Sequence, residues 1–295
     1  MKLLEKPPTD RDFTTRSVAQ SVPTAKHRLA VNILHLTCIV VLLGAAFRAH
    51  AAPPVAAKSV SQADSKDAPA IDPGSIDALN KMGVYLRTQK SFQVVANITT
   101  DDVLDDGQTI QFSSKADLVA ARPDRFRVEV TDDDGHRFFF YDGKNFTIYG
   151  QVVNYYATVP APPTIAKLAD DLSDKYGIEL PLSDLFQWGT DPDALHRIKG
   201  AIDIGPSSVN GVTCEHYAFH EKDIDWQIWI ELGDFPLPLK LAIRTLTDDA
   251  KPQYTETLTW NLAPSYSDDA FTFAPPPGVA RIPLAELKAK ATEKK

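Results

Sequence analysis

The chain has 295 residues, a formal net charge of −8 at pH 7 and only two cysteines. An acidic chain without basic runs is a poor partner for nucleic acid, whose phosphates need Lys or Arg, and for anionic lipid headgroups. Composition and charge therefore argue against both nucleic acid and charged membrane surfaces as partners.

The first 51 residues have the order of a secretory signal peptide. A hydrophilic segment (1–28) precedes an apolar run (29–47), and Ala49 and Ala51 fit the small-residue positions of a cleavage site. The apolar run is near the ~20 residues that span a bilayer, so a retained N-terminal membrane anchor is the alternative. Both readings place the remaining chain outside the cytoplasm, and we expect a periplasmic protein without an integral membrane span after cleavage.

Cleavage also changes the charge and the cysteine count. Residues 1–51 carry seven Lys or Arg and three Asp or Glu, so their removal moves the formal charge from −8 to −12. Cys38 lies in the removed part, which leaves Cys214 alone and permits no internal disulfide. A hydrophobic core must therefore hold the fold together.

The rest of the chain divides into three parts. Residues 52–70 are rich in Ala, Pro, Ser and Lys without an apolar period, which is typical of a flexible linker. Residues 71–284 carry regular apolar patterns and are long enough for a single domain with its own core. Residues 285–295 form a polar tail.

Two segments carry apolar residues at helical spacing. The first follows a helix start at Asp72-Pro73, and the second, at 162–177, ends at Gly177, a natural C-terminal stop. A shorter helix is expected from Ser183. The two apolar stripes consist of Ile76, Leu79, Met82 and Leu86 and of Ile165, Leu168, Leu172 and Tyr176.

From about Ser91 the apolar period changes to 2, which indicates strands. Asp-Gly or Asn-Gly pairs at 106–107, 134–135, 142–143 and 210–211 suit two-residue hairpin loops, because both residue types tolerate positive φ. We expect about eleven strands in an antiparallel meander, with a last short one in the sequence AFTFAP after the final long strand.

An antiparallel sheet of this size must curl or close to protect its edges, and the helices need an apolar surface to cover. The predicted fold class is therefore mainly β (α+β). We expect an open antiparallel half-barrel with an N-terminal helix and a mid-chain helical lid across its concave side. Such a shape is a container.

One strand combines residue types that often bind metals. Cys214, His216 and His220 share one face of the strand expected over 212–221. At ~3.3 Å per residue the two histidines are about 13 Å apart, too far to bind one zinc ion. The main interpretation is a structural Cys/His pair, and a metal site or a reactive thiol are the alternatives.

Other signs of chemistry are weak. The sequence has no nucleophile elbow, zincin helix, phosphate loop or dinucleotide fingerprint. Its six Asp-Asp pairs do not match a calcium-binding loop, and most fall at expected turns. We therefore expect no cofactor and no metal, and an enzyme is the least supported class.

Three runs, at 141–165, 176–186 and 214–243, resemble a family of predicted periplasmic bacterial proteins. More distantly, the DGK hairpin that follows RPDRFRVEV resembles the LolA/LolB-like lipoprotein-carrier superfamily. The resemblance implies a roughly eleven-stranded open half-barrel with helices capping an apolar cavity. The superfamily includes lipoprotein chaperones and a periplasmic sensor of envelope stress.

The leading hypothesis is a non-enzymatic periplasmic binding or carrier protein for a hydrophobic ligand, such as a lipid, an acyl chain or a lipoprotein. A chain of about sixteen carbons offers on the order of 10 kcal/mol on burial, before ordering costs. The alternative is a protein-interaction module that acts as an envelope sensor or assembly factor. The expected cavity wall comprises Phe138, Phe140, Phe146, Ile148, Trp226 and Ile228 on strands, and Leu168 and Leu172 on the lid helix.

Overall fold

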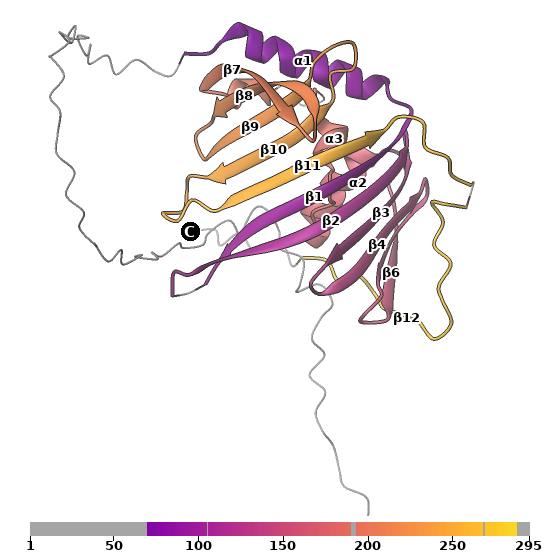
Figure 1. Ribbon diagram of the computed structural model, residues 1–295. Coiled ribbons are helices and arrows are strands. Elements are labelled where there is room, and N and C mark those ends of the chain that lie inside the picture. The colour runs from indigo at the N-terminus through magenta and orange to yellow at the C-terminus, as the bar shows by residue number, and fades with distance from the viewer. Residues whose placement is uncertain (1–69, 105, 190–192, 268, 288–295) are drawn as a thin grey trace, which may run out of the picture.

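The computed structural model describes residues 70–104, 106–189, 193–267 and 269–287 (Figure 1). The predicted signal peptide and nearly all of the predicted linker and tail lie outside the described residues.

Twelve strands and five helical segments make up the described chain. The strands are β1 (Ser91–Val103), β2 (Thr109–Ala121), β3 (Arg125–Asp132), β4 (Gly135–Asp142), β5 (Asn145–Gly150), β6 (Tyr155–Pro160), β7 (Gly200–Val209), β8 (Val212–His220), β9 (Ile224–Glu231), β10 (Pro238–Thr245), β11 (Gln253–Asn261) and β12 (Ala280–Arg281). The helical segments are α1 (Pro73–Thr88), α2 (Ile165–Asp171), the π-helical turn η2 (Leu172–Tyr176), α3 (Asp184–Gln187) and the 3₁₀ turn η3 (Leu195–Arg197).

All twelve strands belong to one sheet, in the order β12-β6-β5-β4-β3-β2-β1-β11-β10-β9-β8-β7. Neighbouring strands are antiparallel except β12 and β6, which run parallel. The sheet has two edges, at β12 and β7, and does not close. The predicted open antiparallel half-barrel is therefore confirmed.

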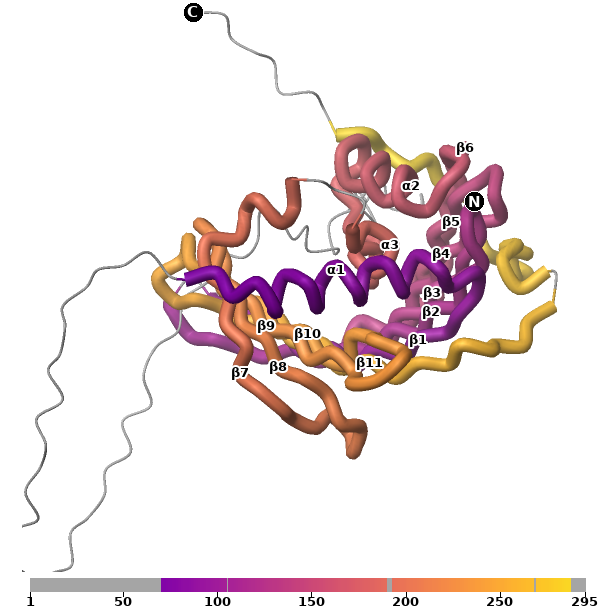
Figure 2. The backbone as a smooth tube through the Cα atoms, turned by 90° about the horizontal axis from the view of Figure 1, so that it is seen from above, coloured from indigo at the N-terminus to yellow at the C-terminus, as the bar shows by residue number. Residues whose placement is uncertain are grey.

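The sheet consists of two meanders joined in the middle by β1 and β11, which pair from Gln93↔Asn261 to Thr100↔Tyr254. β6 and β7 are consecutive in the chain but lie near opposite edges of the sheet. Their connection, the crossover (161–199), must therefore pass over one face of the sheet. The crossover carries α2 and α3, and Figure 2 shows the sheet curving around these two helices.

Helix α1 begins where the sequence predicts. The Asp72 carboxylate accepts hydrogen bonds from the backbone N–H and the hydroxyl of Ser75, both at 2.7 Å, and so satisfies the exposed helix start. Leu79, Met82 and Leu86 are almost fully buried against the concave face of β7 to β10. The predicted apolar stripe of this helix is therefore its contact with the sheet.

The turn predictions are also confirmed. Each of the four Asp-Gly or Asn-Gly pairs lies in or beside a hairpin loop between neighbouring antiparallel strands. Between β7 and β8, Asn210 and Gly211 have φ values of 51° and 82°. Two consecutive positive φ values are what a type I′ turn requires.

Two strand predictions differ from the structure. The short strand expected in AFTFAP is wrong, because that stretch contains no strand. β6 was not anticipated, and β12 lies just beyond the AFTFAP stretch. Phe271 and Phe273 contact other aromatic rings there, and the prolines that follow lack the N–H that a sheet ladder needs.

Candidate functional site

Strand register decides which side chains face the helices. On β4 the buried residues are Phe139 and Tyr141, which pair with Ile148 and Phe146 of β5 and belong to the core under the crossover. The side chains of these four residues therefore lie on the concave face of this half of the sheet.

The structure places the eight expected wall residues on two different faces. Trp226 and Ile228 lie on the concave face under α1, and Phe146, Ile148, Leu168 and Leu172 lie in the core under the crossover. Phe138 and Phe140 alternate with Phe139 and therefore lie on the outer face, half-buried. Their expected position on the concave wall is corrected, while ligand contact by any of the eight stays a prediction.

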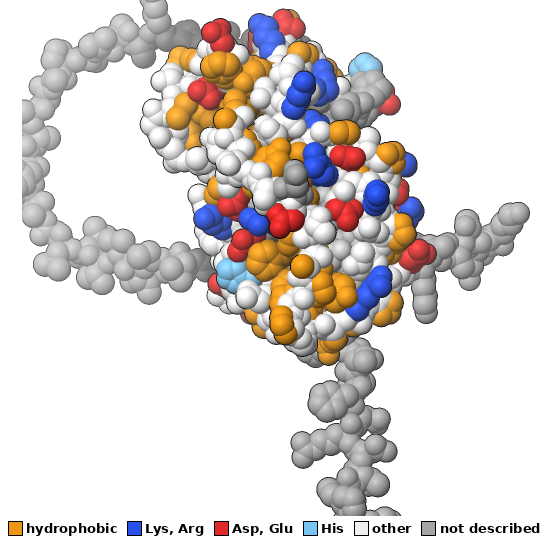
Figure 3. All heavy atoms as spheres, turned by 90° about the vertical axis from the view of Figure 1, so that its right-hand side faces the viewer, with side chains coloured by type: hydrophobic (Ala, Val, Ile, Leu, Met, Phe, Trp, Pro, Cys, Tyr) orange, Lys and Arg blue, Asp and Glu red, His pale blue; other side chains and the backbone are white. Residues whose placement is uncertain are grey.

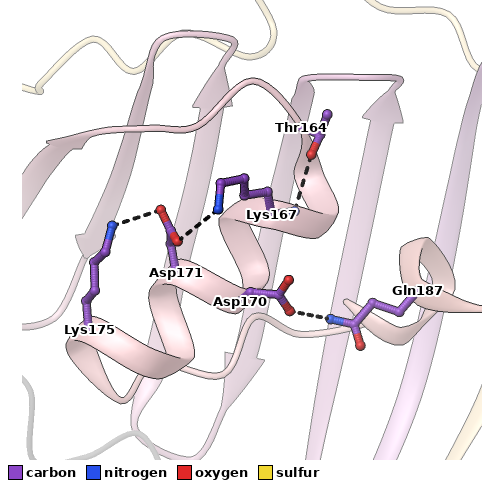
Figure 4. Close-up of polar contacts among 6 residues, drawn as sticks. All are labelled: Thr164, Lys167, Asp170, Asp171, Lys175 and Gln187. Carbon is purple, nitrogen blue, oxygen red and sulfur yellow. Dashed lines mark hydrogen bonds and ion pairs between the residues drawn. The ribbon is translucent and has the colours of Figure 1, made fainter. Parts of the chain in front are cut away.

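The part of the crossover that covers the sheet, here called the lid (residues 164–188), is ordered by polar contacts on its outer side (Figure 4). Thr164 caps α2 by accepting a hydrogen bond from the backbone N–H three residues later, at 3.3 Å. Asp171 accepts from Lys175 at 2.9 Å, one turn further along. Gln187 donates to Asp170 at 3.4 Å and so ties α3 to α2.

The inner side of the lid is apolar and fills the concave face. Its buried side chains pack on β1 to β5 and form one continuous core with them. They are Ile165, Leu168, Ala169, Leu172, Ile178, Leu180, Leu182, Leu185 and Phe186. The lid therefore occupies the space that an apolar ligand would need in a half-barrel of this kind.

The lid is not built as one regular helix. α2 passes into the π-helical turn η2, which ends at Gly177 with a φ of 65°. Leu182, a bulky buried residue, has a φ of 60°, a conformation that costs free energy for any side chain with a Cβ. The lid thus stores backbone strain in its docked position.

Under the lid the sheet carries a buried acid. Glu256 of β11 is 2% exposed and accepts a hydrogen bond from the Tyr254 hydroxyl at 2.6 Å. Burial, together with the nearby charge of Asp184 from α3, raises the pKa of Glu256 to about 8. Burial likewise raises the pKa of Asp184. The Glu256 carboxyl is therefore mainly neutral at pH 7, and a negative charge on Asp184 of the lid disfavours its ionisation.

These two acids, Glu256 and Asp184, were not predicted from the sequence, although one signal was available. Tyr254, Glu256, Leu258 and Trp260 share one face of β11, and all four belong to or adjoin the interior. An acidic residue in an otherwise apolar stripe marks a buried carboxyl. Its partner Asp184 is not visible from this pattern, because only the crossover brings the two together.

The outer face carries a pocket of about 730 Å³. Its floor comes from the outer side of strands β1 to β5, and its cover is the C-terminal strap, the described residues between 265 and 276. The aromatic residues of its lining are Phe138, Phe140, Tyr149, Tyr266 and Phe273, and its charged ones are Arg127 and Asp269. The two phenylalanines that are absent from the concave wall thus line a different cavity.

A second hollow, of about 780 Å³, lies at the β7 end of the sheet. Residues 70–72 and strands β7 to β11 line it. At this edge Ile71 bridges to Ala201 in parallel, while Ile202 and Ile204 of β7 are 56% and 54% exposed. This edge therefore shows apolar side chains to solvent.

The Cys/His strand has no site-like arrangement. Cys214 is fully buried in a small apolar cluster, and burial raises the pKa of its thiol. His216 stacks on Trp229 with ring centres 4.0 Å apart, and His220 contacts Asp225 at 2.6 Å. Among the described residues no group of three or more His, Cys, Asp or Glu side chains could hold a metal ion.

These features define a class of architecture, an open antiparallel half-barrel whose concave face is covered by an N-terminal helix and a helical crossover. The chain belongs to the family of predicted periplasmic proteins called DUF2092, whose model matches residues 75–285. This membership confirms the resemblance seen in the sequence and the periplasmic location.

Solved structures of similar shape come from several bacteria. The Mycobacterium tuberculosis lipoprotein LppX is 11% identical, with a TM-score of 0.42 over 66% of this chain and 100% of that chain. A LolA superfamily protein from Nitrosomonas europaea is 12% identical, with a TM-score of 0.32 over 68% and 97%. The Pseudomonas aeruginosa MucA/MucB complex contains a chain 19% identical, with a TM-score of 0.37 over 65% and 59%.

At TM-scores below 0.5 these likenesses support no argument about function. No curated protein matches the chain in sequence. None of the described helices has the length and apolar character needed to cross a membrane.

Proposed function

We propose that the protein is a non-enzymatic periplasmic binding protein that holds an apolar ligand, such as an acyl chain, between the concave face of the sheet and the lid. The observation that carries this proposal is the lid itself. Its apolar side chains already cover the concave face, it docks with strain at Leu182, and the charge of its Asp184 acts on the buried Glu256 of the sheet. A segment docked in this way can move away from the sheet at moderate cost and admit a ligand beneath it.

The energetics of the exchange are permissive. A ligand chain of about sixteen carbons offers on the order of 10 kcal/mol on burial, from ~0.8 kcal/mol per methylene. Part of this free energy replaces the contacts that the displaced lid loses, and part offsets the ordering of the ligand. Relief of the strain at Leu182 favours the displaced state.

Native mass spectrometry of the mature protein from a periplasmic extract, followed by denaturing lipid extraction, tests the proposal directly. We expect a stoichiometric lipid adduct, or binding of an added labelled fatty acid to the apo protein. Hydrogen exchange of the ligand-bound protein should be faster in residues 165–188 than in the apo protein. Failure of the fatty acid to bind would overturn the proposal, and binding without any change in lid exchange would overturn the concave location.

A second candidate function is protein interaction at the β7 edge, which the exposed Ile202 and Ile204 favour. An unpaired strand edge can accept an additional strand from a partner. Periplasmic crosslinking should then capture a partner with the wild-type protein and lose it with an Ile202→Lys, Ile204→Lys double variant. Equal capture by both proteins would contradict this function.

Acid–base chemistry is a third reading of the interior, because Asp184 and Glu256 both have raised pKa values. Neither carboxyl lines the outer pocket or the β7 hollow, and Glu256 is 2% exposed. We therefore assign the two acids to closure of the lid and not to catalysis.

A further inference from the structure

The C-terminal strap is anchored on both sides of the outer pocket. On one side Phe271 is 1% exposed, with Tyr266 packed edge-on at 5.0 Å and the Arg125 guanidinium over its ring at 5.5 Å. On the other side β12 pairs with β6, and the Asn154 amide donates to the Gly278 carbonyl at 2.9 Å. The strap is therefore held in place while the space beneath it stays open.

The pocket wall is aromatic, with its rings nearly parallel to one another. Phe138 lies almost parallel to Phe140 and to Tyr149, with interplanar angles of 19° and 21°. Phe273 comes down from the strap and contacts Phe140 at 5.4 Å and Tyr149 at 5.3 Å. Rings in this arrangement suit a flat aromatic body or an extended hydrocarbon, and a volume of about 730 Å³ is that of small-molecule sites.

A cation lies among these rings. Arg127 of β3 is half-buried and sits directly across from Phe140 and Val119 on the neighbouring strands. Within the described ranges its guanidinium has no hydrogen bond, ion pair or ring contact. By contrast, Arg125 stacks on Phe271, and Arg122 donates to the Leu185 carbonyl at 3.1 Å.

The other polar groups of the lining are already engaged or peripheral. Asp269 is exposed on the strap and accepts a hydrogen bond from the Ser267 hydroxyl. Gln93 donates to Asp117 at 2.9 Å. The planar fork of an arginine matches a carboxylate or sulfonate by two parallel hydrogen bonds. A ligand with an anionic group beside an apolar body would therefore complement Arg127 and the rings around it.

We propose that the outer pocket binds a small amphipathic anion, whose aromatic or aliphatic body lies against Phe138, Phe140 and Phe273 and whose acidic group pairs with Arg127. Figure 3 looks onto the side of the molecule that carries the strap, where hydrophobic side chains lie among basic and acidic ones. This site is separate from the concave face, so the proposal for one site can be disproved while the proposal for the other stands.

The experiment uses two fluorescent probes of similar shape, the anion 8-anilinonaphthalene-1-sulfonate and the neutral N-phenyl-1-naphthylamine. Arg127→Gln should weaken binding of the anionic probe by about tenfold or more and leave the neutral probe unchanged, because only the charge-assisted hydrogen bonds are lost. Lys115→Gln, an equal charge change at an exposed site on the same outer face, is the matched control. Phe273→Ala should weaken both probes.

Each outcome bears on the proposal. Urea unfolding midpoints of the variants check that they fold, and nuclear magnetic resonance shifts on probe addition should map to β3, β4 and the strap. No binding of the anionic probe to the wild-type protein would overturn the proposal, as would equal weakening by Arg127→Gln and Lys115→Gln. Shifts confined to the lid would assign the probe to the concave face and overturn the outer site.

Discussion

Glu256 makes the stability of this protein depend on pH in a direction that can be predicted. Folding raises the pKa of this carboxyl from its ordinary value of 4.5 to about 8, mainly by burial. Between these values the folded state keeps a proton that the unfolded state has lost. Stability therefore falls as pH rises from about 4.5 to about 8, by up to about 1.4 kcal/mol per pH unit and at most roughly 5 kcal/mol in total.

Glu256→Gln is the perturbation that isolates this effect. The glutamine amide is neutral at every pH, has nearly the same shape and keeps an oxygen that can accept the Tyr254 hydroxyl hydrogen bond. The variant should therefore equal or exceed the wild-type stability near pH 8. Its stability should also depend less on pH between about pH 5 and pH 8. Asp184, whose pKa burial also raises, leaves a remaining slope of the same sign.

Equilibrium unfolding in urea at several pH values measures the difference in stability between the wild type and Glu256→Gln. The slope of the unfolding free energy against urea concentration should be the same for both proteins, which shows that the unfolded state has not changed. Glu231→Gln, the same chemical change on a half-exposed residue of β9, is the control and should keep the wild-type profile. Parallel profiles for wild type and Glu256→Gln would refute the reasoning, because they would mean that Glu256 ionises equally in both states.

Three further changes test the packing. Leu172→Ala in the lid should lower the free energy of unfolding in urea by about 2–5 kcal/mol. Because it weakens the docked lid, it should also tighten fatty-acid binding. Weaker fatty-acid binding would contradict the displacement of the lid by the ligand. Phe146→Ala should lower the unfolding free energy by about 3–5 kcal/mol and Phe138→Ala by clearly less, because only Phe146 is fully buried. Equal unfolding free energies of the two variants would contradict the placement of Phe146 on the concave face and Phe138 on the outer face. Gly211→Ala should cost about 1–2 kcal/mol through its φ of 82° alone, since a methyl group there meets open space; an unchanged unfolding midpoint would contradict the type I′ turn.

The sequence predicts those parts of the fold that local chemistry decides. The Asp72 cap, the Gly177 stop and the Asn210-Gly211 turn need no distant partner, and all three are where the patterns indicated. β12 has no local signal, because its two residues are ordered by pairing with β6. β6 was not predicted because Pro160 and the prolines after it are typical of a loop.

The candidate site was harder to predict than the fold because alternation does not say which face is concave. The difficulty is greatest on β4, whose run of three phenylalanines is apolar on both sides. Phe139 packs under the lid, while Phe138 and Phe140 lie beneath the strap, and both covers come from distant parts of the chain. Apolar residues on both faces of an antiparallel strand are themselves a signal that both faces are covered.

The crossover also has a mechanical consequence. It joins β6 to β7 across ten strand spacings of roughly 4.8 Å, so a flat sheet would hold its ends roughly 48 Å apart. Fully extended, residues 161–199 could reach well beyond that distance, so the length of the crossover does not limit the curve. The packing of the lid against the concave face holds the two halves of the crossover in place instead. Release of the lid from the concave face would leave two meanders held together by the β1–β11 ladder, able to relax toward a shallower curve.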